Sequence, residues 1–214
     1  MSARVADLDV LPVRSKTWLP GYSRAAFGPA WTPGVNAGGE CDTREAVLAR
    51  DLIDVVRPDG YKVTRGTLIS PYTGARVSFV RGAATSPAVL IDHLVSLADA
   101  WSAGANGWTP QQRERFANDP VELLMVDEAS NQTKSDATTD AWLPRSPAGR
   151  CHLVTAQVTV KARYRLLVTR AERAAMRRSW PAARSRRGAT TPAGRLQGWV
   201  GPRPGPATSR RCPH

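Results

Sequence analysis

The sequence contains no long apolar stretch. No run of about 18 or more apolar residues occurs in the chain, so we expect neither a membrane-spanning helix nor a membrane partner. The first residues, MSARVAD, also lack the apolar core of a secretory signal peptide. Composition alone therefore favours a cytoplasmic protein.

Cysteine and histidine are scarce, with three residues of each. Three cysteines cannot all pair within one molecule, which argues against a disulfide-rich scaffold. No Cys/His cluster has the spacing of zinc ligands. We expect no zinc site and no small-molecule cofactor.

Acidic residues are outnumbered by basic ones, 18 against 30, which gives a net charge of +12. The excess is uneven, because nine arginines and no acidic residue lie between Arg177 and His214. The rest of the chain carries 21 basic and 18 acidic residues. A polyanionic partner is indicated, with much of the attraction in the tail. Residues 179–214 are rich in Pro, Gly, Arg and Ser, and this composition predicts a disordered segment that binds nucleic acid nonspecifically.

The spacing of apolar residues along the chain predicts an α+β protein. It has a lead-in at residues 1–20, one domain at residues 21–178, and the tail at residues 179–214. Residues 1–20 read as poorly structured, with Leu11-Pro12-Val13 as a docking point, and residues 21–40 read as loops. Alternating apolar residues on both sides of the turn at 71–74 predict a β-hairpin over 61–81. An apolar stripe at Ala46, Leu48, Leu52, Val55 and Val56 predicts a helix from Asp42 through Asp54. Capping signals predict helices at 109–117 and 170–178.

Four polar residues surround two apolar strands. Asp92 and His93 end the first strand, and Asn131 and Lys134 follow the second, Leu123 to Val126, on a helix that starts near Asp127. Hydrolysis of a phosphodiester needs a base and a hard cation. His93 titrates in the right range for a base, and Asp92 and Asn131 offer oxygens that Mg²⁺ prefers. Lys134 shares a helix face with Asn131, which lets its ammonium meet a phosphate.

One geometric condition applies to this arrangement. Neighbouring residues on a regular strand point to opposite faces. Asp92 and His93 therefore serve one substrate only if the strand twists or ends there.

These residues resemble the HNH, or ββα-metal, endonuclease pattern. More narrowly, the chain is similar over about residues 11–178 to the HNH family related to the C-terminal domain of GmrSD-type restriction enzymes. The motif itself is carried by residues 91–97 (IDHLVSL), 118–124 (NDPVELL) and 131–136 (NQTKSD). Further matching stretches are GYSR at 21–24, FGPAW at 27–31, CDTR at 41–44, PYTG at 71–74 and AWLP at 141–144.

The resemblance implies a ββα-metal core at residues 89–136, with an additional β-hairpin and peripheral helices. It implies that His93 is the general base, that Asp92 and Asn131 hold a divalent metal, and that Lys134 gives electrostatic support. Mg²⁺ is the expected cation, with Mn²⁺ as the alternative. The expected substrate is DNA, with RNA as a further possibility, cleaved with little sequence preference because no recognition module is visible.

Glu122 departs from the family pattern, which has its middle asparagine at this position. An ionised glutamate accepts hydrogen bonds but donates none. It either holds His93 and raises the pKa of the imidazole, as a catalytic partner, or misplaces the base. The alternative to an active endonuclease is therefore an impaired relative that only binds nucleic acid.

Several other residues have competing interpretations. Arg76 and Arg81 on the hairpin are candidates for phosphate contacts, although solvated strand arginines are more common. Trp101 and Trp108, in the insertion between the motif strands, either stack on bases or anchor the insertion as buried residues, which is more common. Asp99 is a candidate for indirect support of the metal site.

The resemblance also bears on disulfides, secretion and one ambiguous segment. It implies a partner for Cys41 near position 61, where this chain has Tyr61, and a partner for Cys151, for which Cys212 is the only candidate. Three unpaired thiols are the alternative.

Relatives look exported, which implies a secreted protein whose start lies upstream. Residues 151–168 alternate like a strand at Ala156 to Ala162, but the resemblance implies a helix, which we adopt.

Overall fold

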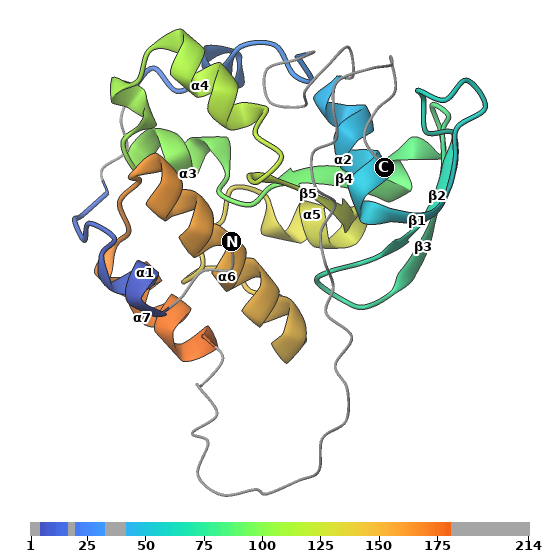
Figure 1. Cartoon of the computed structure of the whole chain (residues 1–214). Coiled ribbons are helices and arrows are strands. Elements are labelled where there is room, and N and C mark those ends of the chain that lie inside the picture. Colours follow the sequence, from blue (N-terminus) through green and yellow to red (C-terminus); the bar gives the residue numbers. More distant parts are fainter. Residues whose placement is uncertain (1–4, 17–19, 33–41, 181–214) are drawn as a thin grey trace, which may run out of the picture.

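The computed structural model describes residues 5–16, 20–32 and 42–180 (Figure 1). It is an α+β protein with two small antiparallel sheets. The α-helices are α1 (Val5–Asp9), α2 (Thr43–Asp51), α3 (Leu97–Ser102), α4 (Pro110–Ala117), α5 (Glu128–Lys134), α6 (Pro147–Tyr164) and α7 (Arg170–Ser179). The strands are β1 (Leu52–Val56), β2 (Arg65–Ile69), β3 (Arg76–Val80), β4 (Val89–His93) and β5 (Leu123–Asp127), and three 3₁₀ turns are η1 (Arg24–Phe27), η2 (Ser86–Ala88) and η3 (Ala105–Gly107).

The predicted hairpin is present as β2 and β3, which pair antiparallel from Arg65 opposite Val80 to Ile69 opposite Arg76. A third strand, β1, was predicted wrongly as helix. Helix α2 ends at Asp51, and Leu52 already has an extended backbone. The β-branched residues that follow suit a strand, and Asp54, at a φ of 54°, lies where the pairing of β1 with β2 shifts register.

The two-stranded sheet lies between the three-stranded sheet and helices α3, α4 and α6 (Figure 1). Strands β4 and β5 pair antiparallel, with Val89 opposite Asp127 and His93 opposite Leu123. An apolar cluster that includes Leu68, Phe79 and Met125 joins the two sheets. The hydroxyl of Ser70 donates to Asp127 at 2.6 Å, which ties the end of β2 to the start of α5.

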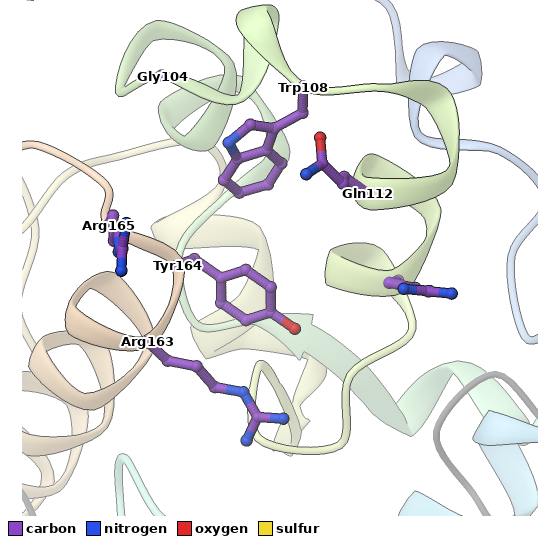
Figure 2. Close-up of a pocket in the computed structure, with 7 residues that line it drawn as sticks. Gly104, Trp108, Gln112, Arg163, Tyr164 and Arg165 are labelled. Carbon is purple, nitrogen blue, oxygen red and sulfur yellow. The ribbon is translucent and has the colours of Figure 1, made fainter.

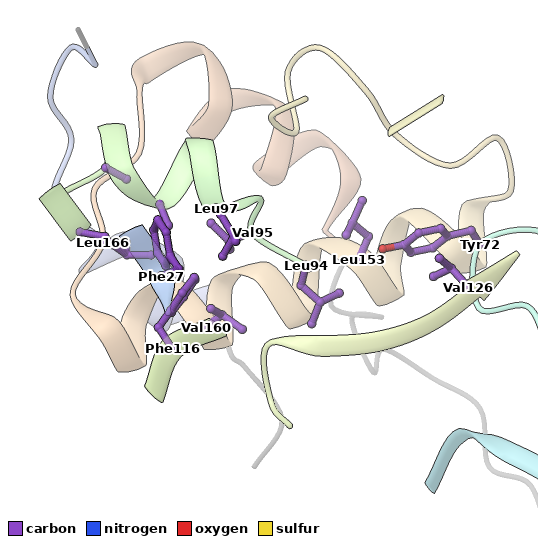
Figure 3. Packing of buried hydrophobic residues seen from close by; sticks show 13 residues of the cluster. Phe27, Tyr72, Leu94, Val95, Leu97, Phe116, Val126, Leu153, Val160 and Leu166 are labelled. Carbon is purple, nitrogen blue, oxygen red and sulfur yellow. The ribbon is translucent and has the colours of Figure 1, made fainter. Parts of the chain in front are cut away.

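Helices α3, α4 and α6 pack around a second cluster, shown in Figure 3. Phe27, Phe116 and Leu166 lie at one end of it, and Tyr72 and Val126 at the other. The predicted capping boxes are confirmed at Thr109 for α4 and at Thr169 for α7. The ambiguous segment 151–168 is mostly helix, because α6 begins at Pro147, after the N-cap Ser146, and continues to Tyr164.

The lead-in is more ordered than we predicted. It contains α1, whose Leu8 is buried with Leu11 in a third apolar cluster beside Val158 of α6. Val13, as expected for a docking point, forms a parallel bridge with Val168. Leu8, Leu11 and Val13 therefore pack in this cluster, whereas Val10 remains exposed.

A buried ionic network joins the lead-in to the helices. Lys161 on α6 contacts Asp99 at 2.7 Å and Glu172 at 2.8 Å, and Lys16 contacts the same two carboxylates. Both carboxylates and Lys161 are buried. Asp99 therefore joins α3 to α6 and the lead-in through ion pairs, which corrects its predicted role as a support of the metal site.

Three predictions fall partly or wholly outside the described residues. They are the disordered tail at 179–214, of which only residues 179 and 180 are described, the loops between 33 and 40, and the state of Cys41 and Cys212. Among the described helices, none combines the length and apolar character needed to cross a bilayer.

Candidate nuclease site

The two motif strands and the motif helix form one continuous unit. Helix α5 follows β5 directly, and the side chain of Asp127 caps it by accepting from the backbone N–H of Ser130 at 2.9 Å. Asp92 and His93 are the last two residues of β4. Because the strand ends there, its alternation no longer separates the two side chains, and both reach the same cleft.

That cleft has a volume of about 200 Å³ and polar walls. Asp92, His93 and Asn131 all line it, so the structure brings together two neighbouring residues and a third that follows His93 by 38 positions. The remaining lining residues are Tyr22, Arg24, Ile91, Ser96, Leu97, Ser135 and Asp136.

The carboxylate of Asp92 is buried and held on both oxygens. Lys134 Nζ donates to Oδ1 at 2.8 Å, and the hydroxyl of Tyr72 donates to Oδ2 at 2.8 Å. Burial raises the pKa of Asp92, and the ammonium of Lys134 together with both hydrogen bonds opposes this rise. Lys134 thus favours the ionised form of the carboxylate.

Lys134 itself points inward. It is 1% exposed, and its ammonium also donates to the backbone carbonyl of His93 at 2.8 Å. The sequence placed this ammonium on the same helix face as Asn131, toward a phosphate. In the structure it lies under the cleft and fixes the end of β4, so its support for the site acts through Asp92.

The imidazole of His93 is oriented by a backbone group. Its Nε2 lies 3.1 Å from the carbonyl oxygen of Ala117. A carbonyl only accepts hydrogen bonds, so Nε2 carries the proton and Nδ1 keeps its lone pair when the ring is neutral. Burial lowers the pKa of His93 to about 4. The ring is therefore neutral at pH 7 and able to accept a proton.

Glu122 supports the loop after β4 instead of contacting the imidazole. Its Oε1 accepts from the backbone N–H of Val95 at 3.0 Å. Among the described residues, its Oε2 has no hydrogen-bond partner. Complete burial raises the pKa of Glu122 well above the usual range of a glutamate. The imidazole of His93 is instead held by the carbonyl of Ala117.

The residues present fit a hard cation. Within the described ranges, no three His, Cys, Asp or Glu side chains form a metal site, so a cation here depends on the carboxylate of Asp92, the amide of Asn131 and water, with the carboxylate of Asp136 also lining the cleft. Mg²⁺ is commonly held in that way. An ionised carboxylate has about four lone-pair positions, of which Lys134 and Tyr72 use two on Asp92. Asp92 and Asn131 therefore retain free oxygen positions for a metal.

Sequence reasoning missed two contributors to this site. Tyr72, in the PYTG stretch, was given no role because no local pattern links it to Asp92, 20 positions later. Arg24, in the GYSR stretch, is exposed, and among the described residues it is the only lysine or arginine that lines the cleft. Its positive charge also helps to lower the pKa of His93. Both stretches resemble the family pattern in the sequence, which was the available signal, although the stretch at 21–24 lies outside the region 48–179 that the family profile matches.

The remaining predicted residues lie elsewhere. Arg81 donates to the carbonyl of Val63 at 2.7 Å and forms an ion pair with Glu45, so it stabilises the hairpin. Arg76 is exposed at the start of β3 and stays a candidate for phosphate contact. Cys151 is a free cysteine on α6, while Cys212 lies outside the described residues, so their pairing stays a prediction.

The predicted tryptophans are partly buried anchors. Trp101 packs against Tyr22 and Phe27, with ring centroids 6.3 Å apart in both pairs. Trp108 packs edge-on against Phe116 at 5.4 Å. Their structural role in the insertion is therefore confirmed, and Trp108 also lines a cavity outside the cleft (Figure 2).

Comparison with known proteins relates the chain to a protein family and to a curated relative. The profile of the family described as GmrSD restriction endonucleases, C-terminal domain, matches residues 48–179. A protein of Arthroderma benhamiae, described as an uncharacterized secreted protein, is 39% identical over 171 residues, which covers 79% of each chain. No solved structure matches the chain.

Proposed function

Because the chain belongs to the family of GmrSD restriction endonuclease C-terminal domains, which is of the HNH nuclease type, we propose that it is a metal-dependent endonuclease that hydrolyses phosphodiester bonds in DNA. One observation carries the proposal. Asp92, His93 and Asn131, from β4 and α5, line the same polar cleft. RNA is the alternative substrate, since no described residue of the cleft is placed to distinguish a ribose from a deoxyribose.

His93 is the general base in this proposal. The neutral ring takes a proton from the attacking water on Nδ1, while Nε2 stays bonded to the carbonyl of Ala117. The bond to Ala117 fixes the tautomer before substrate arrives. A pKa of about 4 keeps the base unprotonated at neutral pH, although it also makes the base weaker than an ordinary histidine.

Asp92 and Asn131 hold the divalent cation, with Mg²⁺ expected and Mn²⁺ as the alternative. A cation bound there stabilises negative charge on the phosphate and on the leaving oxygen. Lys134 and Tyr72 fix the carboxylate of Asp92 from behind, so that its remaining lone pairs have a defined direction. Water supplies the other ligands of such a site.

Arg24 is the residue that we expect to bind the substrate phosphate. It is exposed on η1, lines the cleft with Asp92 and His93, and carries a guanidinium whose fork matches two phosphate oxygens. Lys134, the cation suggested by the sequence, is buried against Asp92 and cannot reach a phosphate in this position.

Cleavage of supercoiled plasmid by the purified chain tests this function. We expect nicking with Mg²⁺, loss of nicking in EDTA, and loss in His93→Ala. The matched control is His152→Ala, which removes an exposed histidine on α6 and should leave nicking unchanged. Equal nicking by the two variants would exclude His93 as the base.

A second candidate function is binding of nucleic acid without cleavage. The observation that favours it is the engagement of both Asp92 oxygens by Lys134 and Tyr72, which competes with a metal. This alternative predicts salt-sensitive gel shifts of DNA by the wild-type chain without nicking in Mg²⁺ or Mn²⁺.

We also propose that the protein is secreted, because the similar Arthroderma benhamiae protein is described as secreted. Immunodetection in fractionated cultures of the source organism tests this. Signal confined to the cell fraction would contradict it.

A further inference from the structure

A second carboxylate lines the cleft beside that of Asp92. It belongs to Asp136, an exposed residue that follows α5 and shares the cleft with His93 and Asn131. Among the described residues that line the cleft, Asp92 and Asp136 are the only two with carboxylates. Asp136 has no part in the proposed function so far, although it faces the same space as the residues that do.

The backbone brings Asp136 to the cleft by ending the helix. In a continued helix, residue 136 would lie about 140° around the axis from Asn131, because each residue adds about 100°. Helix α5 instead ends at Lys134, and Ser135 has a φ of 46°, in the left-handed region that residues other than glycine seldom adopt. The turn at Ser135 thus places Asp136 on the same cleft as Asn131.

Two hydrogen bonds fix the backbone around Asp136. The hydroxyl of Ser96 donates to the carbonyl oxygen of Asp136 at 3.3 Å, and the N–H of Ala137 donates to the carbonyl oxygen of Lys134 at 2.9 Å. Ser96 is also the N-cap of α3, because its side chain accepts from the N–H of Asp99 at 3.1 Å. The exposed carboxylate of Asp136 therefore extends from a backbone that is anchored to both α5 and α3.

Asp92 alone supplies little net negative charge for a divalent cation. The ammonium of Lys134 lies 2.8 Å from its carboxylate and offsets its charge. The amide of Asn131 is neutral, and Arg24 adds a positive charge to the cleft wall. Asp136 supplies the second negative charge among the described lining residues. A carboxylate attracts a divalent cation twice as strongly as a monovalent one at the same distance.

Asp136 does not complete a direct metal site. Among the residues that the structure describes, no three His, Cys, Asp or Glu side chains are placed to hold one ion together. The cleft, at about 200 Å³, has room for several water molecules. Mg²⁺ usually keeps several of its waters when it binds to a protein. Water donates hydrogen bonds, so a carboxylate on the cleft wall can act on the ion through its water shell.

We propose that Asp136 is a positioning residue for the cation, whose carboxylate accepts hydrogen bonds from the water that the cation carries and strengthens its binding in the cleft. The proposal rests on the metal site of the proposed function and adds to it a residue that acts through water. Cation binding is measurable without nucleic acid, so this role is tested separately from cleavage.

Mn²⁺ binding to the full chain is measured without nucleic acid, from the loss of the electron paramagnetic resonance signal of free Mn²⁺. The test variant is Asp136→Asn, which keeps the shape of the side chain and removes its charge. The matched control is Asp140→Asn, at an exposed aspartate that does not line the cleft. Asp92→Asn shows whether the ion lies in the cleft, because it removes the proposed carboxylate ligand. Circular dichroism checks the fold of each variant.

We expect Asp136→Asn to raise the dissociation constant for Mn²⁺ about fivefold at about 0.1 M salt, which is the screened Coulomb attraction between a divalent ion and a carboxylate across one water layer. Asp140→Asn should change the constant by less than about twofold, because more distant charges are screened at this ionic strength. At about 1 M salt the effect of Asp136→Asn should also fall below about twofold. Asp92→Asn should weaken binding more than Asp136→Asn at both salt concentrations.

Four results would overturn the proposal. They are an absence of Mn²⁺ binding to the wild type, equal dissociation constants for Asp136→Asn and Asp140→Asn, unchanged binding to Asp92→Asn, and an effect of Asp136→Asn that persists at high salt, as for a direct ligand. Plasmid nicking by the wild type is scored separately. Absence of nicking together with Mn²⁺ binding that depends on Asp136 would refute the nuclease function and leave the role of Asp136 standing.

Discussion

Lys134→Met tests where the ammonium of the motif lysine points. In the structure this ammonium is 1% exposed and donates to Asp92 and to the carbonyl of His93, each at 2.8 Å. Methionine keeps the length and apolar stem of the side chain but leaves the carboxylate of Asp92 buried without its counterion. Removal of one partner from a buried ion pair typically costs about 3–5 kcal/mol of stability. Two hydrogen bonds involving a charged group, at about 1.5–3 kcal/mol each, give a similar sum.

Urea unfolding of the full chain at pH 7, followed by far-ultraviolet circular dichroism, measures this loss. The matched control is Lys62→Met at an exposed lysine, where a change within about 0.5 kcal/mol is expected. Asp92→Asn added to Lys134→Met should recover part of the loss, because no unpaired carboxylate remains buried. If Lys134→Met cost no more than Lys62→Met, the ammonium would lie in solvent, as the sequence first suggested, and the inward arrangement would be wrong.

Three further predictions concern single residues. Burial lowers the pKa of His93 from 6.5 to about 4 in the folded protein, so the histidine binds a proton more readily in the unfolded chain than in the folded one. We therefore expect the free energy of unfolding to fall by about 3 kcal/mol as the pH falls from 6.5 to 4. Urea midpoints across this range should show that loss in the wild type relative to His93→Gln. Burial raises the pKa of Glu122 in the folded protein, so folding becomes less favourable as the pH rises above 4.5 and the buried carboxyl is forced to ionise. The stability of Glu122→Gln should therefore increase relative to that of the wild type between pH 5 and 8. Equal dependence of the two unfolding free energies on pH would contradict this. Arg24→Gln should lower the rate of plasmid cleavage about tenfold or more, as a charge-assisted contact with the phosphate is lost, while Arg14→Gln, at another exposed arginine, should have little effect.

Local signals in the sequence predicted most elements correctly. The caps Thr109, Asp127 and Thr169 sit next to the helices that they start, so they act within one turn and are readable without tertiary structure. The hairpin of β2 and β3 is similarly local. Strand β1 was missed because Leu52, Val55 and Val56 fit the spacing of a helix, and only pairing with β2 makes the extended form favourable.

The meeting of three predicted residues in one cleft was predictable from the sequence, but the contacts around them were not. The positions of Asp92, His93 and Asn131 follow from a strand–strand–helix order that the sequence shows. The inward turn of Lys134, the contact of Tyr72 with Asp92, and the use of the Ala117 carbonyl to hold His93 depend on packing between distant segments. No spacing rule predicts such contacts.

The most direct test of the proposed site is Mg²⁺-dependent nicking by Asn131→Ala beside Asn106→Ala. Asn131 lines the cleft with Asp92 and His93, whereas Asn106 is an exposed asparagine on η3. We predict that Asn131→Ala loses nicking at Mg²⁺ concentrations that saturate the wild type, and that Asn106→Ala retains it. Wild-type nicking by Asn131→Ala would show that this amide holds no cation and that the cleft is not the catalytic centre.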